Sequence, residues 1–386
     1  MAIIDPMVTR TLPPPEHSFF LLGPRATGKT TWIHQNFPDA PTYDLLRSDE
    51  LLRLASDPSV LGRECEELPD QAWIVIDEVQ RAPALLDEVQ RLMTRKHQRF
   101  VLSGSSTRKL RRGGANLLAG RAEVHRLLPF TMSELSFERD LEDALAYGML
   151  PLAVEREKPH AFLKSYCETY IREEVMAEAL VRQIGSFARF LEVAARMNAQ
   201  VVNVSSTARD ASVARPTATD YFQILVDTLL ADWVEAWRPK PGVRQTVHPK
   251  LYFFDTGVVC QLSARAPGPV RPEDRGFLLE TFVLHELRAH IEYADLGYPV
   301  RYWRTHDGAE VDFVVETDRG PVLIEVKSGA RWEAKFGAGI ARFRAEYSGV
   351  RDAVGVYCGT RALRQDGLRV LPWKTFLKEL AEGSIL

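Results

Sequence analysis

Two groups of residues in this chain of 386 residues have types and spacings that could do chemistry. The first is Gly23-Pro24-Arg25-Ala26-Thr27-Gly28-Lys29-Thr30 with Thr31 behind it, and it fits the pattern G-x-x-x-x-G-K-[ST] without a mismatch. Backbone amides of such a loop form a concave anion site where a helix begins. We expect the loop to bind ATP, with Lys29 reaching the β- and γ-phosphates and the Thr30 hydroxyl contacting Mg²⁺.

Two consecutive acidic residues complete the pattern of a nucleoside triphosphate hydrolase. The apolar run at 73–76 ends in Asp77 and Glu78. We expect Asp77 to hold the Mg²⁺ shell and Glu78 to orient the attacking water. A further apolar strand at 99–103 leads to Ser103 and Ser105, either of which could touch the γ-phosphate or that water. The alternative for each serine is a cap on the following helix.

The second group lies near the C-terminus. Residues 309–316 alternate as a strand does, 317–320 predict a turn, and 321–327 predict the returning strand. Period-two alternation puts Glu325 and Lys327 on one face, and hairpin pairing can bring Asp312 beside them. This arrangement resembles the core of PD-(D/E)xK nucleases, in which two carboxylates bind Mg²⁺ and the lysine stabilises charge.

In that nuclease fold an upstream helix donates one more acid, for which Glu280 is the candidate and Glu286 a weaker one. The predicted metal site is therefore Glu280, Asp312, Glu325 and Lys327. Two alternatives stay open: a degenerate nuclease fold that only binds nucleic acid, and a plain charge pair between Glu325 and Lys327.

Between these groups the pattern predicts short helices and a hairpin. Periodic apolar residues predict helices over 161–183, 186–199, 204–210 and 217–229, with strands at 233–237 and 250–254. This order resembles a winged helix whose wing, 238–250, contains basic residues and no acid. The predicted nucleic-acid contacts are Arg215, Lys240, Arg244 and Lys250. The alternative is a winged helix used for subunit packing or as a structural lid.

Four segments together carry a family resemblance: GPRATGKTT, WIVIDEVQRAPALLDEVQ, VLSGSSTRKL and LAGRAEVHRLLPFTMSEL. The chain resembles the AAA-type ATPases that carry a C-terminal DUF4143 region. The resemblance implies an AAA+-like core with a five-stranded parallel sheet. It also places Arg121 where such ATPases have an arginine finger, which would act in trans and imply a homo-oligomer, a hexameric ring being one such assembly. The alternative is a surface pair of Arg121 with Glu123 or Glu134.

The composition and net charge of the chain limit what these sites can do. Hydrophobic residues make up 45% of the chain, charged residues 26%, and the formal net charge is −3, so any nucleic-acid contact must come from local basic patches. The four cysteines form no CxxC pair, which favours a reducing, cytoplasmic location. No apolar run reaches the length of a membrane span, and we expect no membrane partner.

The predicted fold class is α/β in three parts. These are an AAA+-like P-loop ATPase domain over 1–150, a helical lid and winged-helix region over 151–260, and a PD-(D/E)xK nuclease-like domain over 261–386. The predicted function is an ATP-dependent enzyme that remodels or translocates on DNA, duplex or branched. Two other classes remain: an NTPase regulatory switch with a protein partner, of toxin or defence type, and an ATP-gated, metal-dependent nuclease.

Overall fold

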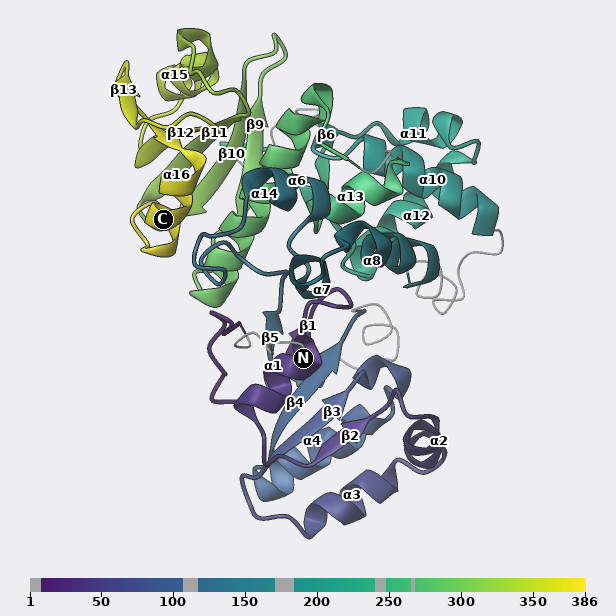
Figure 1. Cartoon of the computed structure of the whole chain (residues 1–386). Helices are drawn as coiled ribbons and strands as arrows, with labels where there is room; N and C mark the ends of the chain where they lie inside the picture. The colour runs from purple at the N-terminus through teal and green to yellow at the C-terminus, as the bar shows by residue number, and fades with distance from the viewer. Residues whose placement is uncertain (1–7, 107–116, 171–183, 240–247, 265–267) are drawn as a thin grey trace. The chain divides into compact units, whose positions relative to one another are not determined.

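The structure is a computed structural model, and it describes all residues except 1–7, 107–116, 171–183, 240–247 and 265–267 (Figure 1). The chain divides into two compact units. The P-loop unit contains residues 10–129 and 223–230, and the C-terminal unit contains 130–222 and 231–386 together with the described residues 8–9. The three-domain boundaries expected from the sequence stay a prediction. No helix in the described part of the chain is long and apolar enough to cross a membrane.

The P-loop unit is built on a five-stranded sheet in which every pairing is parallel, in the order β2-β3-β4-β1-β5 (Figure 1). Its central strands are continuous apolar runs because both of their faces are covered. This confirms the parallel sheet that the family resemblance implies. The strands are β1 (Phe19–Leu22), β2 (Thr42–Asp44), β3 (Trp73–Asp77), β4 (Arg99–Gly104) and β5 (Glu123–Arg126).

The phosphate loop joins β1 to the first helix. Gly28 precedes that helix with φ 92°, a left-handed conformation that favours glycine. Gly23 is equally constrained, because a Cβ there would lie 2.4 Å from the Leu127 carbonyl oxygen. The helices of this unit are α1 (Lys29–Asn36), α2 (Ser48–Ser56), α3 (Ser59–Glu66) and α4 (Leu85–Lys96), with a 3₁₀ turn η1 (Val79–Arg81) after β3.

The C-terminal unit begins with helices. The helix expected over 161–183 is helical as far as the structure describes it, because the short helix α8 passes directly into a π-helical turn η3 (Tyr166–Tyr170). Residues 171–183 lie outside the described residues. The helices up to residue 262 are α6 (Leu141–Tyr147), α7 (Pro151–Glu155), α8 (Pro159–Ser165), α10 (Ile184–Arg196), α11 (Val204–Asp210), α12 (Arg215–Asp227) and α13 (Thr256–Leu262).

A small antiparallel sheet accompanies α10, α11 and α12. Its order is β6-β8-β7, and its strands are β6 (Gln200–Val201), β7 (Ala231–Val234) and β8 (Lys250–Phe253). The strand expected at 233–237 therefore starts earlier and ends at Val234. Ala236 makes one isolated bridge to Tyr302 instead. The segment between β7 and β8 includes 240–247, which lie outside the described residues.

A six-stranded mixed sheet forms the rest of this unit, in the order β13-β14-β12-β11-β10-β9. The expected hairpin is confirmed, since β10 and β11 pair antiparallel from Phe313–Ile324 to Thr317–Gly320. The strands are β9 (Val300–Arg304), β10 (Glu310–Thr317), β11 (Gly320–Lys327), β12 (Asp352–Tyr357), β13 (Leu363–Gln365) and β14 (Leu368–Pro372), and the helices are α14 (Pro272–Tyr293), α15 (Ala338–Glu346) and α16 (Trp373–Ala381).

Candidate nucleotide site and a buried ionic cluster

The phosphate loop and the acid of β3 meet. The Thr30 hydroxyl donates a hydrogen bond to Asp77 Oδ2 at 2.9 Å. The Lys29 ammonium is buried and donates to the carbonyl oxygens of Gly23 at 2.8 Å and Pro24 at 3.2 Å. A threonine hydroxyl next to a buried carboxylate is an oxygen pair suited to Mg²⁺, so the residues present fit that ion.

Arg10 supports the loop and was missed by the sequence analysis. Its guanidinium donates to the carbonyl oxygens of Thr27 at 2.7 Å and Leu128 at 2.5 Å. It therefore joins the loop to the segment after β5. A lone arginine before the first strand carries no sequence signal, because only the fold brings these two carbonyl groups together.

Ser103, near the end of β4, and Ser105, just after it, both contact the acids. The Ser103 hydroxyl donates to Asp77 Oδ1 and accepts from the Glu78 amide at 3.2 Å. The Ser105 hydroxyl donates to Glu78 Oε2 at 3.3 Å. Their expected roles toward the γ-phosphate or the attacking water stay a prediction.

Gln80 is the second residue that the sequence analysis missed. Its side-chain amide donates to Glu78 Oε2 and, at 3.1 Å, to the Ser105 hydroxyl. Glu78 itself has φ 59°, an uncommon value for a residue other than glycine. Gln80 thus holds the carboxylate of a residue whose backbone is already constrained. The signal that could have found it is its place two residues after the acidic pair.

The remaining predicted residues of this site lie around it. Thr31 and Arg121 are exposed, while Arg25 and Ala26 are half-buried within the loop. Arg121 follows the short turn Leu117–Gly120, and its amide donates to the Leu118 carbonyl. Exposure is compatible with the expected arginine finger, and that role stays a prediction.

The predicted acid–acid–lysine set of the C-terminal unit is also brought together. The Lys327 ammonium lies 2.5 Å from Glu325 Oε1 and 3.5 Å from Asp312 Oδ2. Asp312 Oδ2 also accepts the Val326 amide at 2.8 Å. Glu280, from α14, accepts the Tyr252 hydroxyl at 3.1 Å. Burial, with the nearby Asp312 carboxylate, raises the pKa of Glu280 to about 8.

Lys250 belongs to this cluster, which corrects its expected place on the basic wing. Its side chain is 4% exposed, and its ammonium lies 2.5 Å from Glu310 Oε1 and 3.5 Å from Glu280 Oε2. Burial lowers the pKa of Lys250, but the carboxylates of Glu280 and its neighbours outweigh burial and raise that pKa above its ordinary value. A buried lysine that is paired in this way cannot contact DNA phosphates.

The residues of the cluster do not fit the expected divalent metal. Within the described ranges, no three His, Cys, Asp or Glu side chains are arranged so that they could hold a metal ion. The carboxylates of Glu280 and Glu310 pair with Lys250, and those of Asp312 and Glu325 pair with Lys327. Glu286 lies elsewhere, accepting the Met132 amide at 2.8 Å.

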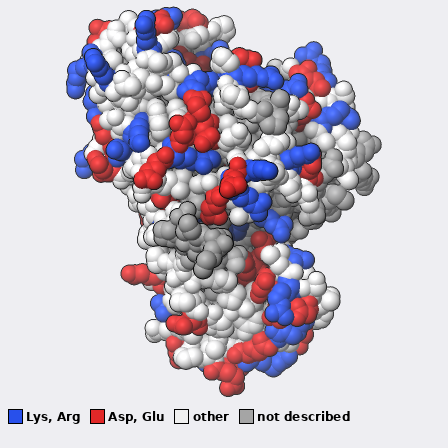
Figure 2. Space-filling view, in the orientation of Figure 1, with Lys and Arg blue, Asp and Glu red and all other residues white. Residues whose placement is uncertain are grey.

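The other predicted nucleic-acid residues have mixed outcomes. Arg215 is exposed where α12 begins, whereas Lys240 and Arg244 lie outside the described residues. Figure 2 shows that Lys and Arg side chains are interspersed with Asp and Glu over the face in view. That face carries no continuous basic stripe among its described residues.

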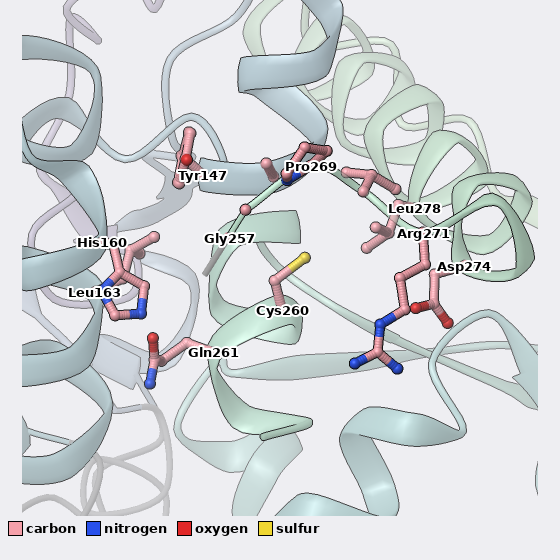
Figure 3. A pocket seen from close by; sticks show the side chains of 13 residues that line it. Tyr147, His160, Leu163, Gly257, Cys260, Gln261, Pro269, Arg271, Asp274 and Leu278 are labelled. Carbon is pink, nitrogen blue, oxygen red and sulfur yellow. The ribbon is translucent and has the colours of Figure 1, made fainter. Parts of the chain in front are cut away.

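A separate hollow in the C-terminal unit has a cavity volume of about 40 Å³ (Figure 3). Tyr147, His160, Cys260, Arg271 and Asp274 are among the side chains that line it. None of the predicted site residues lines this hollow. Its lining includes Gly268, which directly follows residues outside the described ranges, and we assign the hollow no function.

Comparison with known families defines the class of protein. An AAA domain matches residues 16–136, a domain of unknown function (DUF8612) matches 138–267, and a domain of unknown function (DUF4143) matches 275–376. The chain belongs to the family of AAA-type ATPases with a C-terminal DUF4143 region, as its motifs predict.

Individual relatives agree with this assignment. "Uncharacterized protein Rv2008c" of Mycobacterium tuberculosis and "Uncharacterized protein Mb2031c" of Mycobacterium bovis are each 30% identical over 316 residues, which is 80% of this chain and 69% of theirs.

Solved structures give weaker likenesses. One is a Signal Transduction ATPase with Numerous Domains (STAND) protein with a tetratricopeptide repeat sensor from Pyrococcus horikoshii, at 14% identity, 73% of this chain, 46% of that chain and a TM-score of 0.21. Another is protein VC1899 from Vibrio cholerae, at 12% identity, 85% of this chain, 94% of that chain and a TM-score of 0.22. Likenesses at TM-scores this low carry no argument.

Proposed function

We propose that this protein is an ATP-dependent enzyme that acts on DNA. The observation that carries the ATPase part is the meeting of Thr30 with Asp77, at 2.9 Å, beside the buried Lys29. The family assignment supports a nucleoside triphosphatase, and the acidic pair at the end of β3 supports hydrolysis rather than binding alone.

The residues of the candidate nucleotide site have distinct roles in this proposal. The loop amides and Lys29 bind the triphosphate, and Glu78 orients water and accepts its proton. Mg²⁺, held by Thr30 and Asp77, supplies charge neutralisation at the phosphate oxygens when it is bound. Lys29 exchanges its bonds to the Gly23 and Pro24 carbonyls for phosphate oxygens.

The region after residue 184 supports a DNA contact. Helix, strand, two helices and two strands follow one another from α10 to β8, an order that favours a winged helix. We propose that Arg215 and the basic residues Lys240 and Arg244 contact DNA phosphates. Lys250 is not among them, because it is buried against Glu280 and Glu310.

We propose that the C-terminal sheet with α14 is a PD-(D/E)xK nuclease-like domain that contacts DNA without cutting it. The β10–β11 hairpin and the approach of Glu280 support the nuclease-like part. The lysine pairing of its carboxylates supports the absence of cutting, because a carboxylate committed to an ammonium group is a poor metal ligand.

The test is ATP turnover with and without duplex, single-stranded and four-way DNA. We expect at least one DNA form to raise turnover. Replacing Arg215, Lys240 and Arg244 together by alanine should weaken DNA binding. It should also reduce the slope of log K against log salt by about 0.9 for each DNA phosphate that the protein no longer neutralises. Arg344→Ala, on the exposed face of α15, is the matched control.

One outcome would overturn the DNA part of the proposal, and a second would overturn the absence of DNA cutting. Turnover that is blind to every DNA form would favour a regulatory switch with a protein partner. Magnesium-dependent nicking that is lost in Asp312→Ala and Lys327→Ala would instead favour an ATP-gated nuclease.

A further inference from the structure

The segment between β11 and α15, residues 328–337, combines aromatic and basic side chains. It follows Lys327 directly and ends in a 3₁₀ turn, η4 (Ala334–Gly337). The Cys358 amide donates to the Gly329 carbonyl oxygen at 3.1 Å and ties the start of the segment to the end of β12. The segment therefore has a defined place next to the buried ionic cluster to which Lys327 belongs.

Two aromatic rings of this segment lie edge to face. The ring centres of Trp332 and Phe336 are 5.6 Å apart, with an angle of 82° between their planes. Trp332 packs on the sheet, since a Cβ at Gly355 of β12 would lie 2.5 Å from its ring. Both aromatic residues are half-buried. Packing on the sheet accounts for Trp332, but it leaves the solvent-accessible part of Phe336 unexplained.

Positive charges lie close to the Phe336 ring. The Lys327 and Lys335 ammonium groups lie 5.9 Å and 5.4 Å from its centre, within the range of cation–π contacts. Arg331 and Lys335 are both exposed. Glu333 is the one acid in the sequence of the segment, and it pairs with Lys335 at 2.7 Å. Ion pairs between exposed side chains contribute little to stability, so Lys335 can exchange Glu333 for a phosphate at little cost.

Aromatic rings next to exposed cations suit single-stranded nucleic acid. Its bases stack on aromatic side chains, and its phosphates pair with nearby lysines and arginines. The faces of a base are available for such stacking only where the base is not already stacked within a duplex. The composition of the segment therefore favours a single strand over a duplex.

We propose that Trp332 and Phe336, with Arg331 and Lys335, form a stacking site for single-stranded DNA. A base stacks on Phe336, Trp332 holds the Phe336 ring in place, and the two basic residues pair with the flanking phosphates. The proposal rests on the DNA contact in the proposed function and names the form of DNA that this part of the chain binds. It needs no metal ion, and the pairs of the buried ionic cluster stay intact.

The test is fluorescence anisotropy of a labelled oligothymidine strand, titrated with the full chain without nucleotide. The native protein should bind this strand. Phe336→Leu keeps an apolar side chain but loses the ring, so it should weaken oligothymidine binding by about 5- to 150-fold, the range for the stacking of one base. The same variant should bind a duplex of equal length as the native protein does. Phe336→Tyr keeps the ring and should bind both DNA forms normally.

A charge variant and a matched control separate stacking from other effects. Lys335→Gln should reduce the slope of log K against log salt for oligothymidine by about 0.7, the contribution of one phosphate contact on a single strand, whereas Phe336→Leu should leave that slope unchanged. Tyr347→Leu is the control, because Tyr347 is another half-buried aromatic residue packed on the same apolar cluster as Trp332. It should bind oligothymidine as the native protein does.

Three results would overturn the stacking site. The first is native protein that binds duplex DNA but no oligothymidine. The second is folded Phe336→Leu protein that binds oligothymidine as tightly as the native protein and Phe336→Tyr do. The third is tighter binding of oligouridine than of oligothymidine, which would assign the site to RNA. Native protein that binds no form of DNA would instead refute the DNA contact of the proposed function, so the two failures are distinguishable.

Discussion

At the scale of single residues, the position of the Glu78 carboxylate depends on Gln80. The Gln80 amide donates to Glu78 Oε2, and its own carbonyl oxygen is buried without a partner among the described residues. Gly104 makes room for it, because a Cβ at 104 would lie 2.6 Å from Gln80 Oε1. Gln80 is therefore a positioning residue for the acid that orients water.

Gln80→Ala should lower kcat for ATP by about 10- to 100-fold, the range typical of residues that orient a catalytic group. ATP affinity should change little, because Gln80 does not touch the phosphate loop in the contacts that the structure gives. Steady-state turnover and calorimetric ATP binding measure the two separately.

Gln98→Ala is the matched control for this variant. Gln98 is also a buried glutamine of the P-loop unit with an unpartnered oxygen, and it donates to the Cys65 carbonyl at 2.7 Å rather than to Glu78. It should lower stability and leave kcat near the native value. Equal kcat losses in both variants would mean that Gln80 acts only through stability.

The sequence predicts some of these residues and not others for a physical reason. Thr30 and Asp77 were predicted because each is recognised from the residues directly around it, a phosphate loop for Thr30 and the end of an apolar strand for Asp77. Lys250 sits in a run of basic residues and looks exposed, yet its partners Glu280 and Glu310 come from distant elements. The fold determines that Lys250 is buried and paired. The run of basic residues around it in the sequence does not show this.

At the scale of elements, α14 joins two regions of the C-terminal unit. One part of it carries Glu280 to the ionic cluster. Further along, Glu286 accepts the Met132 amide at 2.8 Å, and His285 Nε2 lies 2.9 Å from the Phe130 carbonyl oxygen. Burial raises the pKa of Glu286 to about 8.

This pKa predicts a pH dependence of stability. An ordinary glutamate has lost its proton above about pH 4.5, whereas folded Glu286 keeps its proton up to about pH 8. The folded state thus binds more protons in that window, so the free energy of unfolding falls as pH rises from about 4.5 to about 8 and then levels off. Glu286→Gln should remove this contribution and flatten the fall.

Thermal unfolding across that window, for the native protein and the variant, measures the difference. Glu273→Gln, exposed in the first turn of the same helix, should keep the native pH profile. Parallel profiles for the native protein and Glu286→Gln would refute a buried, protonated Glu286.

Strands and helices were both predicted from local patterns, since the helices expected over 204–210 and 217–229 correspond to α11 and α12. The predicted bounds of β1, β3, β4 and the β10–β11 hairpin match the structure within a residue or two. A buried strand is a short run of consecutive apolar residues, which can be recognised directly in the sequence. In the helix expected over 161–183, the backbone widens into a π-helical turn at Tyr166–Tyr170, and 171–183 lie outside the described residues. Apolar spacing alone cannot distinguish an α-helical turn from a π-helical one.

At the scale of the whole molecule, Arg121 bears on assembly. Its side chain is exposed, and the neighbouring Glu123 carboxylate lies 3.0 Å from His125 Nε2. If Arg121 reaches the γ-phosphate of a neighbouring subunit, as the family resemblance implies, each active site needs two copies of the chain. Such a finger is worth about 10³ to 10⁵ in rate.

Mixing two inactive variants tests this arrangement. Arg121→Ala and Glu78→Gln subunits should each be nearly inactive alone, and mixing them should partly restore turnover, because some interfaces then combine an intact Glu78 with an intact Arg121. Sedimentation with ATP measures the assembly itself. A mixture no more active than its parts, from subunits shown to assemble together, would exclude a finger acting in trans.

ATP hydrolysis by the native protein, Lys29→Ala and Glu78→Gln, with calorimetric ATP binding in the presence of magnesium, tests the central claim most directly. We predict that the native protein binds and hydrolyses ATP, and that Lys29→Ala loses both properties. Glu78→Gln should bind ATP and hydrolyse it at least about 100-fold more slowly. Folded Lys29→Ala protein that hydrolyses ATP at the native rate would contradict the account.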